Sequence, residues 1–522
     1  MPQPNLAKPL MILGTHSNAG KSILVTALCR IFAQDGYRVA PFKAQNMALN
    51  AGVTPDGHEI GRATIAQAEA AGVAPHVDMN PILLKPEGHR RSQVVLNGKP
   101  YAHIKAENWY SLKNELWNHA ASALDRLRSR YDVVVMEGAG SPVEINLKAG
   151  DIVNMRVACH VNSPVLLVGD IDRGGVFASL VGTMVLLEPH ERELVKGFII
   201  NKFRGDVSLL GDGLTMLQER AFNTPTLGVI PYLDQIGVAE EDSVALERPI
   251  INSTNQTDIA VIRLPRLANF DDFDPLAQET SVTVRYVSQP NELGQPEAII
   301  LPGTKMTLPD LEWLHEVGLV EPILARVEQG TTLVGICGGY QMLGQQVSDP
   351  QGVEAEAGTT RHGLGLLPVN TRFEGEKRTV QVQATLSACF GEGLQGTPLR
   401  GYEIHMGRTE IIHGKLTSSP LGATEGRDSA NLIALSKGEA SPLCRIQPDG
   451  HADGLVRADG RVWGSYLHGL FDNDAFRHAW LHRLGWQDEG QSFDREQAYN
   501  RLADHVRANL NMAEIRRLVG IE

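Results

Sequence analysis

The chain has 522 residues, of which 42% are hydrophobic and 21% charged, and its formal net charge at pH 7 is −13. This length exceeds one ordinary hydrophobic core, so the composition predicts a globular protein of two or three domains. The acidic balance argues against a general nucleic-acid binder and against a protein that lies on anionic membrane surfaces.

Cysteine usage and hydropathy predict a cytoplasmic location. The five cysteines are odd in number and widely scattered, which suits a reducing compartment better than a disulfide framework. The first residues lack the basic start, long apolar core and cleavage site of a signal peptide. The most apolar stretch, residues 161–188, is interrupted by Asp170, Asp172 and Arg173, so we do not expect it to span a membrane.

The first half of the chain alternates between strand-like and helix-like segments. Helices are predicted at residues 21–34 and 60–71. Apolar strands are predicted at residues 9–15, 38–44, 131–140, 163–172, 197–203 and 226–232. Near-continuous apolar strands separated by helices are typical of a parallel sheet covered on both faces. We therefore expect one α/β domain over residues 1–233.

The segment "GTHSNAGKS", residues 14–22, follows the first strand and opens the first helix. In this context a glycine-rich turn can point backbone N–H groups at a phosphate, with Lys21 on the β- and γ-phosphates and the Ser22 hydroxyl on Mg²⁺. The spacing departs from the standard P-loop, because Thr15 stands where the first glycine belongs. A chance Gly-Lys-Ser at a helix start is the alternative. The candidate nucleotide-binding residues of this loop are Thr15, Ser17, Asn18, Gly20, Lys21 and Ser22.

Polar side chains also follow the later strands of this domain. Glu137 ends the strand at 131–140, where a carboxylate beside the phosphate loop can hold Mg²⁺. Asp170 and Asp172 occupy a similar place after the next strand, and Asp170 is also considered for contact with the substrate or the transferred phosphoryl group. Helix capping or a solvated loop is the alternative for all three. Asn201 ends the strand at 197–203, where its amide could contact an adenine edge.

Three polar residues follow the second strand in "FKAQNM". Lys43, Gln45 and Asn46 are predicted on the sheet edge that faces the γ-phosphate, so we consider them for contact with the substrate or the transferred phosphoryl group. Ordinary solvation at the end of a strand explains their polarity equally well.

A polar, acidic stretch at residues 234–257 is predicted to be a linker, and a second α/β pattern follows it at residues 258–475. Strands are predicted at residues 258–265, 282–287, 298–304 and 332–339, near 400–412, and at 462–467. The remainder, residues 476–522, looks helical, and we expect it to pack on the second domain.

Cys337 lies in "LVGICGGYQML", between an apolar strand and a helix start. Neighbouring glycines supply the backbone freedom of a sharp strand-to-helix elbow, which exposes a side chain next to the positive end of a helix. Such a position favours a reactive thiolate that could attack a carbonyl carbon. A small, buried, inert cysteine is the alternative.

A reactive cysteine needs a base. His468, in "WGSYLHGLF", follows an apolar segment of the same domain and is our first candidate, and His405 in "GYEIHMG" competes with it. A capping or core histidine is the alternative. Backbone N–H groups of Gly303 and Gly338 are candidates for an oxyanion hole.

Residues 333–343 and 463–470 resemble class I glutamine amidotransferase domains. This resemblance implies that Cys337 attacks the side-chain amide of glutamine and that His468 carries the proton. That class usually has a glutamate two residues after the histidine, whereas Leu470 stands there in this chain. The departure matches the branch found in cobalamin biosynthesis and leaves open what orients His468, with Glu403 as one possibility.

The first half resembles dethiobiotin synthetase in its phosphate loop, and the whole chain resembles the cobyric acid synthase family. The matching segments are "FKAQNMALNA", "EGAGSPVEINL", "GDIDRGGVFASL", "INKFRGD" and "GYEIHMGRT". The resemblance implies an ATP- and glutamine-dependent ligase that amidates the b, d, e and g carboxylates of adenosylcobyrinic acid a,c-diamide. It implies Mg²⁺ and small-molecule substrates, with no tightly bound prosthetic group, nucleic acid or membrane partner.

Two rival functions stay open at this point. The first is a cobyrinic acid a,c-diamide synthase, which acts earlier on the same ring. The second is a P-loop ATPase switch akin to partitioning ATPases, whose amidotransferase-like domain is not catalytic. Against the switch, His16 stands where those ATPases carry a second lysine, and Cys337 and His468 are both present. The sequence does not indicate an oligomeric state.

Overall fold

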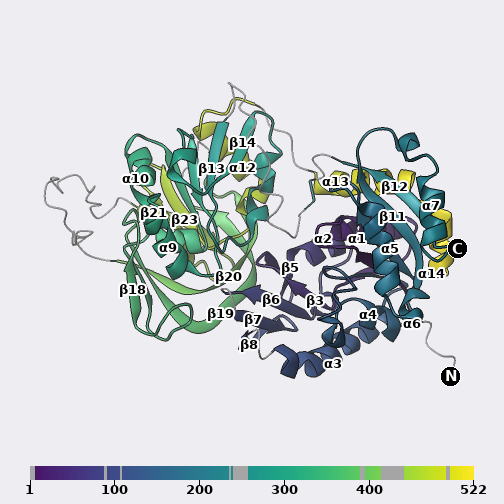
Figure 1. Ribbon diagram of the computed structural model, residues 1–522. Helices are drawn as coiled ribbons and strands as arrows, with labels where there is room; N and C mark the ends of the chain where they lie inside the picture. Colours follow the sequence, from purple (N-terminus) through teal and green to yellow (C-terminus); the bar gives the residue numbers. More distant parts are fainter. Residues whose placement is uncertain are drawn as a thin grey trace. The chain divides into compact units, whose positions relative to one another are not determined.

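The computed structural model describes residues 6–87, 91–105, 109–233, 237–238, 257–387, 394–412, 440–488 and 494–521. The chain divides into two compact units, one formed by Met1–Ala245 with Asp494–Glu522 and the other by Leu246–Phe493 (Figure 1). The predicted linker at 234–257 lies almost entirely outside the described residues.

The first unit is built on a six-stranded sheet in the order β12-β11-β10-β1-β9-β2, and every pairing in it is parallel. Its strands are β1 (Lys8–Gly14), β2 (Val39–Phe42), β9 (Val133–Glu137), β10 (Val165–Asp170), β11 (Val195–Phe203) and β12 (Thr226–Pro231). These strands coincide with the six apolar runs of the sequence. The predicted parallel α/β arrangement is therefore confirmed.

Alternate side chains of each strand supply two hydrophobic cores. In β1, Leu10 and Ile12 join one cluster of buried residues, and Met11 and Leu13 join another. Successive side chains of a strand point to opposite faces, so a strand buried on both faces must be apolar throughout. This requirement explains why the strands read as continuous apolar runs.

Helices cover this sheet, and they include the last two helices of the chain. The helices are α1 (Lys21–Gln34), α2 (Arg62–Ala70), α3 (Trp109–Arg128), α4 (Met155–His160), α5 (Val176–Leu186), α6 (Pro189–Arg192), α7 (Gly213–Arg220), α13 (Arg495–Asn509) and α14 (Met512–Val519). The expectation that the C-terminal helices pack on the second domain is wrong for α13 and α14. Tyr499, Leu502 and Val506 of α13 belong to the same core as α1, and the yellow α13 lies beside α1 in Figure 1.

A small sheet interrupts the α/β alternation after β2, and the sequence did not predict it. Its strands, in the order β3-β6-β7-β8, are β3 (Gln45–Met47), β6 (Ile82–Pro86), β7 (Arg91–Leu96) and β8 (Lys99–Lys105). A separate hairpin pairs β4 (Ala51–Val53) with β5 (Glu59–Gly61). Asn46 and Gln45 thus belong to this sheet and not to the end of β2.

The second unit has an eleven-stranded sheet whose main order is β14-β13-β15-β16-β23-β22-β21-β19-β17-β18, with β20 paired to β19. Its strands are β13 (Thr257–Ile262), β14 (Val282–Val287), β15 (Ala298–Leu301), β16 (Thr332–Ile336), β17 (Gln346–Asp349), β18 (Thr359–His362), β19 (Val369–Leu386), β20 (Pro398–Ile411), β21 (Ala440–Ile446), β22 (Ala452–Arg457) and β23 (Val462–Ser465). The pairings from β14 to β23 are parallel, as predicted. From β23 onward the sheet continues mainly with antiparallel pairings, which the sequence did not indicate.

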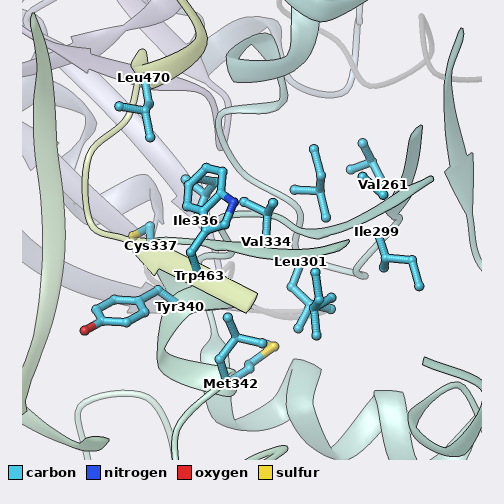
Figure 2. Close-up of a cluster of buried hydrophobic side chains, with 14 of the residues drawn as sticks. Val261, Ile299, Leu301, Val334, Ile336, Cys337, Tyr340, Met342, Trp463 and Leu470 are labelled. Carbon is cyan, nitrogen blue, oxygen red and sulfur yellow. The ribbon is translucent and has the colours of Figure 1, made fainter. Parts of the chain in front are cut away.

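The core of the second unit lies around the parallel strands. Figure 2 shows Val334 and Ile336 of β16 together with Trp463 of β23, and Cys337 at the end of β16 belongs to the same cluster. The helices of this unit are α8 (Asp274–Ala277), α9 (Thr307–Glu316), α10 (Val320–Glu328), α11 (Gly338–Met342) and α12 (Asp474–Arg483). Within the described residues of both units, no helix combines the length and the apolar character needed to cross a bilayer.

Candidate active sites

The predicted phosphate loop connects β1 to α1. Gly20 has φ +94°, and a side chain there would lie 2.0 Å from Nδ2 of Asn201, so only glycine fits this turn. The Lys21 ammonium donates hydrogen bonds to the carbonyl oxygens of His16 (3.0 Å) and Gly140 (3.3 Å). Thr15, Ser17 and Asn18 lie in the same loop. The loop thus has the shape and the lysine of a phosphate site.

Several side chains contact Glu137 near the ends of β9 and β2. Its Oε1 accepts hydrogen bonds from the Ser22 hydroxyl (2.8 Å) and the Lys43 ammonium (2.9 Å), and its Oε2 accepts one from Gln67 Nε2 (2.6 Å). Burial alone would raise the pKa of Glu137, but the charge of Lys43 and these hydrogen bonds outweigh it and lower the pKa. The carboxylate is therefore ionised and fixed beside the loop.

The donor set around Glu137 is suited to Mg²⁺. The Ser22 hydroxyl and the Glu137 carboxylate are oxygen donors 2.8 Å apart, and the buried Oε1 of Gln67 nearby has no hydrogen-bond partner within the part of the chain that the structure describes. Mg²⁺ usually takes one or two protein oxygens and completes its shell with water and phosphate. Among the described residues, no group of three or more His, Cys, Asp or Glu side chains forms a metal cage. Ser22 and Glu137 would thus hold Mg²⁺ together with a bound nucleotide.

Residues at the ends of β10 and β11 contact the loop from its other side. Asn201 is buried, and its Nδ2 donates to the carbonyl oxygen of Ala19 (3.0 Å). Asp170 pairs with Lys202 (3.0 Å), which also donates to the carbonyl oxygen of Asn18 (2.6 Å). The structure therefore places Asn201 and Asp170 as supports of the phosphate loop, whereas Asp172 pairs with Arg204 near the surface (2.8 Å).

Lys43 is brought to the Glu137 cluster, but the other two residues of "FKAQNM" are displaced into the small sheet. Asn46 is 2% exposed, and its Nδ2 lies against Gly61, where a side chain would approach it to 2.5 Å. Gln45 is half-buried in the same strand. The contact of these two residues with a substrate stays a prediction.

Cys337 stands on the expected elbow between β16 and α11. Its backbone has φ +51° and ψ −106°, a conformation that is costly for a residue with a side chain and is typical of functional turns. Gly339 permits this turn, since a side chain there would lie 1.9 Å from the carbonyl oxygen of Leu301. Cys337 is 7% exposed, and its thiol lies 3.5 Å from the carbonyl oxygen of Ile404.

His468 is brought next to this thiol and is held by a carboxylate that the sequence analysis missed. Nδ1 of His468 lies 2.7 Å from Oδ2 of Asp272, whose Oδ1 accepts from the backbone N–H of Gly469 (2.8 Å). The ring stacks on Tyr402 at 5.2 Å between centroids. Burial lowers the pKa of His468, but the charges and hydrogen bonds of Asp272 and Cys337 outweigh it and raise the pKa to about 10.

The two glycines proposed for an oxyanion hole also lie at this site. A side chain at Gly303 would come within 3.1 Å of Cε1 of His468 and 3.8 Å of Cβ of Cys337. A side chain at Gly338 would lie 2.7 Å from Cγ2 of Thr304. Gly303 thus lies beside the thiol and the imidazole, and Gly338 follows Cys337 directly in the chain.

The two competing residues have other partners. His405 stacks on Tyr466 at 3.7 Å between centroids, and its Nδ1 lies 2.8 Å from the carbonyl oxygen of Gly407. Glu403 pairs with Arg378 and lies 3.5 Å from Nε2 of His405. The suggestion that Glu403 orients His468 is therefore wrong, because Asp272 occupies that role in the geometry.

Asp272 and Gln67 were both missed by the sequence analysis. Asp272 lies in "NFDDFD", a short acidic stretch well beyond the end of β13 at Ile262, so it lacks the strand-end position that indicated Glu137. Gln67 is one polar residue in the Ala-rich helix α2, and nothing in its immediate sequence indicates that it faces a carboxylate.

Comparisons with known proteins divide the chain in the same way. Residues 10–245 match the family described as the CobQ/CobB/MinD/ParA nucleotide binding domain. Residues 258–476 match the CobB/CobQ-like glutamine amidotransferase domain. The chain thus combines a P-loop nucleotide-binding domain with a glutamine amidotransferase domain.

Full-length relatives are more specific. The chain is 51% identical over 518 residues to the cobyric acid synthase of Chloroflexus aurantiacus, covering 98% of this chain and 99% of that protein. It is also 51% identical over 520 residues to that of Herpetosiphon aurantiacus, covering 99% of each. Among solved structures, PurLQS from Thermotoga maritima covers 44% of this chain and 99% of its own at 17% identity, with a TM-score of only 0.32. The chain belongs to the cobyric acid synthase family.

Proposed function

We propose that this protein converts the b, d, e and g carboxylates of adenosylcobyrinic acid a,c-diamide to carboxamides, using ATP and glutamine. The observation that carries the proposal is the 51% identity, over nearly the whole chain, to relatives named cobyric acid synthase. The two sites support it, because amidation needs a phosphate site to activate the acid and a nucleophile to release nitrogen.

In the second unit, the proposed reaction is the hydrolysis of glutamine. The Cys337 thiolate attacks the amide carbon of the glutamine side chain, and His468 gives a proton to the departing nitrogen, which leaves as ammonia. Since Asp272 holds Nδ1 of His468, Nε2 is the nitrogen that handles the proton. Backbone N–H groups of Gly303 and Gly338 stabilise the oxyanion. Water then cleaves the thioester, which yields glutamate and restores the thiolate.

In the first unit, the proposed reaction activates a carboxylate that is otherwise a poor electrophile. A carboxylate oxygen of the corrinoid attacks the γ-phosphorus of ATP, ADP leaves, and ammonia then displaces phosphate from the acyl phosphate. Lys21 and the loop amides bind the phosphates, while Lys43, Gln45 and Asn46 are proposed to contact the acceptor or the phosphoryl group. Mg²⁺, held through Ser22 and Glu137, would neutralise phosphate charge.

Mass spectrometry of the a,c-diamide after incubation with ATP, Mg²⁺ and glutamine tests the proposal. We expect successive amidation that ends at the product with all four carboxamides, together with release of glutamate, ADP and phosphate. Turnover of cobyrinic acid alone, with no reaction of the a,c-diamide, would instead assign the earlier synthase. ATP hydrolysis without any amidation or glutamine hydrolysis would favour the switch.

A further inference from the structure

Gln67 is one of the side chains that contact Glu137. Its side chain is 0% exposed on α2, and Nε2 donates to Oε2 of Glu137 at 2.6 Å. Nε2 also lies 3.5 Å from the carbonyl oxygen of Ser22, at the start of α1. The Gln67 amide therefore contacts both the Glu137 carboxylate and the backbone of Ser22, whose hydroxyl donates a hydrogen bond to the same carboxylate.

The two ends of the Gln67 amide have different surroundings. Its nitrogen is engaged by Glu137, whereas its oxygen, Oε1, is buried and has no hydrogen-bond partner among the described residues. Leaving a buried amide oxygen without a hydrogen bond is unfavourable, so such atoms in native proteins usually accept a hydrogen bond from water or a ligand. We therefore expect a hydrogen-bond donor beside Oε1 of Gln67, next to the Glu137 carboxylate.

A hydrated cation would supply that donor. Ser22 and Glu137 offer oxygen atoms suited to Mg²⁺, and Mg²⁺ keeps several waters of its hydration shell when proteins bind it. Residues that hydrogen-bond to metal ligands orient them, and their loss commonly weakens metal binding by about 10–100-fold. An amide is suited to this position, since it donates to the carboxylate and accepts from water.

We infer that Gln67 is a positioning residue of the magnesium site, with Nε2 orienting Glu137 and Oε1 accepting a hydrogen bond from a water of the cation's hydration shell. The inference rests on the Mg²⁺ site of the proposed function. In this role Gln67 acts by positioning the groups around the metal and does not itself contact ATP or the corrinoid.

Mn²⁺ binding to the full chain, in the presence of a non-hydrolysable ATP analogue, provides the test. The electron paramagnetic resonance signal of free Mn²⁺ reports the dissociation constant without any turnover. Gln67→Met keeps a side chain of similar length but removes both the donor and the acceptor. We expect the dissociation constant to rise about 10–100-fold in this variant.

Gln93→Met is the matched control. Gln93 is also a buried glutamine (1% exposed) whose Oε1 has no hydrogen-bond partner in the described ranges, but it lies on β7 of the small sheet, opposite Lys85 and His103. We expect its Mn²⁺ affinity to equal that of the unmodified protein within about twofold. Equal weakening in both variants would mean that a general loss of packing, and not the contact with Glu137, is responsible, and would overturn the inference.

Unchanged binding in Gln67→Met would overturn the inference alone, whereas absence of Mn²⁺ binding in the unmodified protein would remove the proposed metal site as well.

Discussion

Replacing Asp272 by asparagine removes one negative charge from the amidotransferase site with little change in shape. Asp272 contacts Nδ1 of His468 at 2.7 Å and the N–H of Gly469 at 2.8 Å, and both groups are buried. The amide keeps an oxygen for one of these contacts. The substitution therefore tests the charge and the hydrogen-bond direction at His468 and leaves the packing intact.

The expected loss follows from the strength of this ion pair. Two charges with centres about 4 Å apart interact by about 4 kcal/mol at an effective dielectric constant of about 20. The rise of the His468 pKa from 6.5 to about 10, to which Cys337 also contributes, corresponds to about 5 kcal/mol. Losing about 4 kcal/mol of support for the imidazolium should lower kcat/KM for glutamine hydrolysis by about 10³-fold.

The assay is glutamate release from glutamine by the full chain. Asp271→Asn is the matched control, because it makes the same substitution one residue earlier in the same short helix, Phe270–Phe273. We expect Asp271→Asn to remain within about threefold of the unmodified protein, since Asp271 is not the carboxylate on His468. If Asp272→Asn also remains within about tenfold, the ion pair does not support catalysis and the reasoning fails.

Three further predictions concern the two reactions and the fold. Cys337→Ala should abolish amidation with glutamine but spare amidation with added ammonia, whereas Lys21→Ala should abolish both; equal losses for Cys337→Ala in the two assays would place the thiol outside glutamine hydrolysis. The raised pKa of His468, about 10 against an ordinary 6.5, means that protonation stabilises the fold, fully below about pH 6.5 and progressively less up to pH 10. The free energy of unfolding, measured with urea, should therefore fall between pH 7 and 10, and it should fall further in the unmodified protein than in Asp272→Asn. Parallel pH dependences in the two proteins would contradict this. Trp463→Ala removes a fully buried ring that packs on Phe471 and Trp480, so unfolding should cost about 3–5 kcal/mol less, and a loss below about 1 kcal/mol would refute this role in the core.

The parallel strands and the ends that carry Glu137 and Cys337 were predictable because each depends on local sequence. A strand buried on both faces must be apolar along its length, and the residue that follows it lies at the carboxyl edge of the sheet. Both rules apply to a buried parallel strand whichever strands pair with it. The elbow at Cys337 and the phosphate loop likewise require nearby glycines, which a sequence shows directly.

The small sheet and the last two helices were not predictable in the same way. The strand Gln45–Met47 is short and polar, and it exists because it pairs in register with Ile82, Leu83 and Leu84. The amphipathic face of α13 would suit any apolar surface, and its position in the chain suggested the second domain. Its actual partners include Arg30, which pairs with Glu496, and Glu69, which accepts from Tyr499. Such pairings depend on the assembled fold.

Asp272 provides the histidine of this site with a carboxylate partner although the glutamate usual in the amidotransferase class is absent. Leu470, where the amidotransferase class has a glutamate, is 1% exposed and belongs to the hydrophobic core of Figure 2, so a carboxylate there would need a polar partner in an apolar setting. Asp272 contacts the same imidazole from the short helix Phe270–Phe273, 196 residues earlier in the chain, and also accepts a hydrogen bond from the backbone N–H of Gly469. Because what matters to an imidazole is an oxygen within reach of Nδ1, the absence of a glutamate at one sequence position does not indicate an inactive site. An acidic residue in the segment that follows another parallel strand of the same sheet, such as the one in "NFDDFD" after β13, is therefore a position to examine in other chains that lack the glutamate.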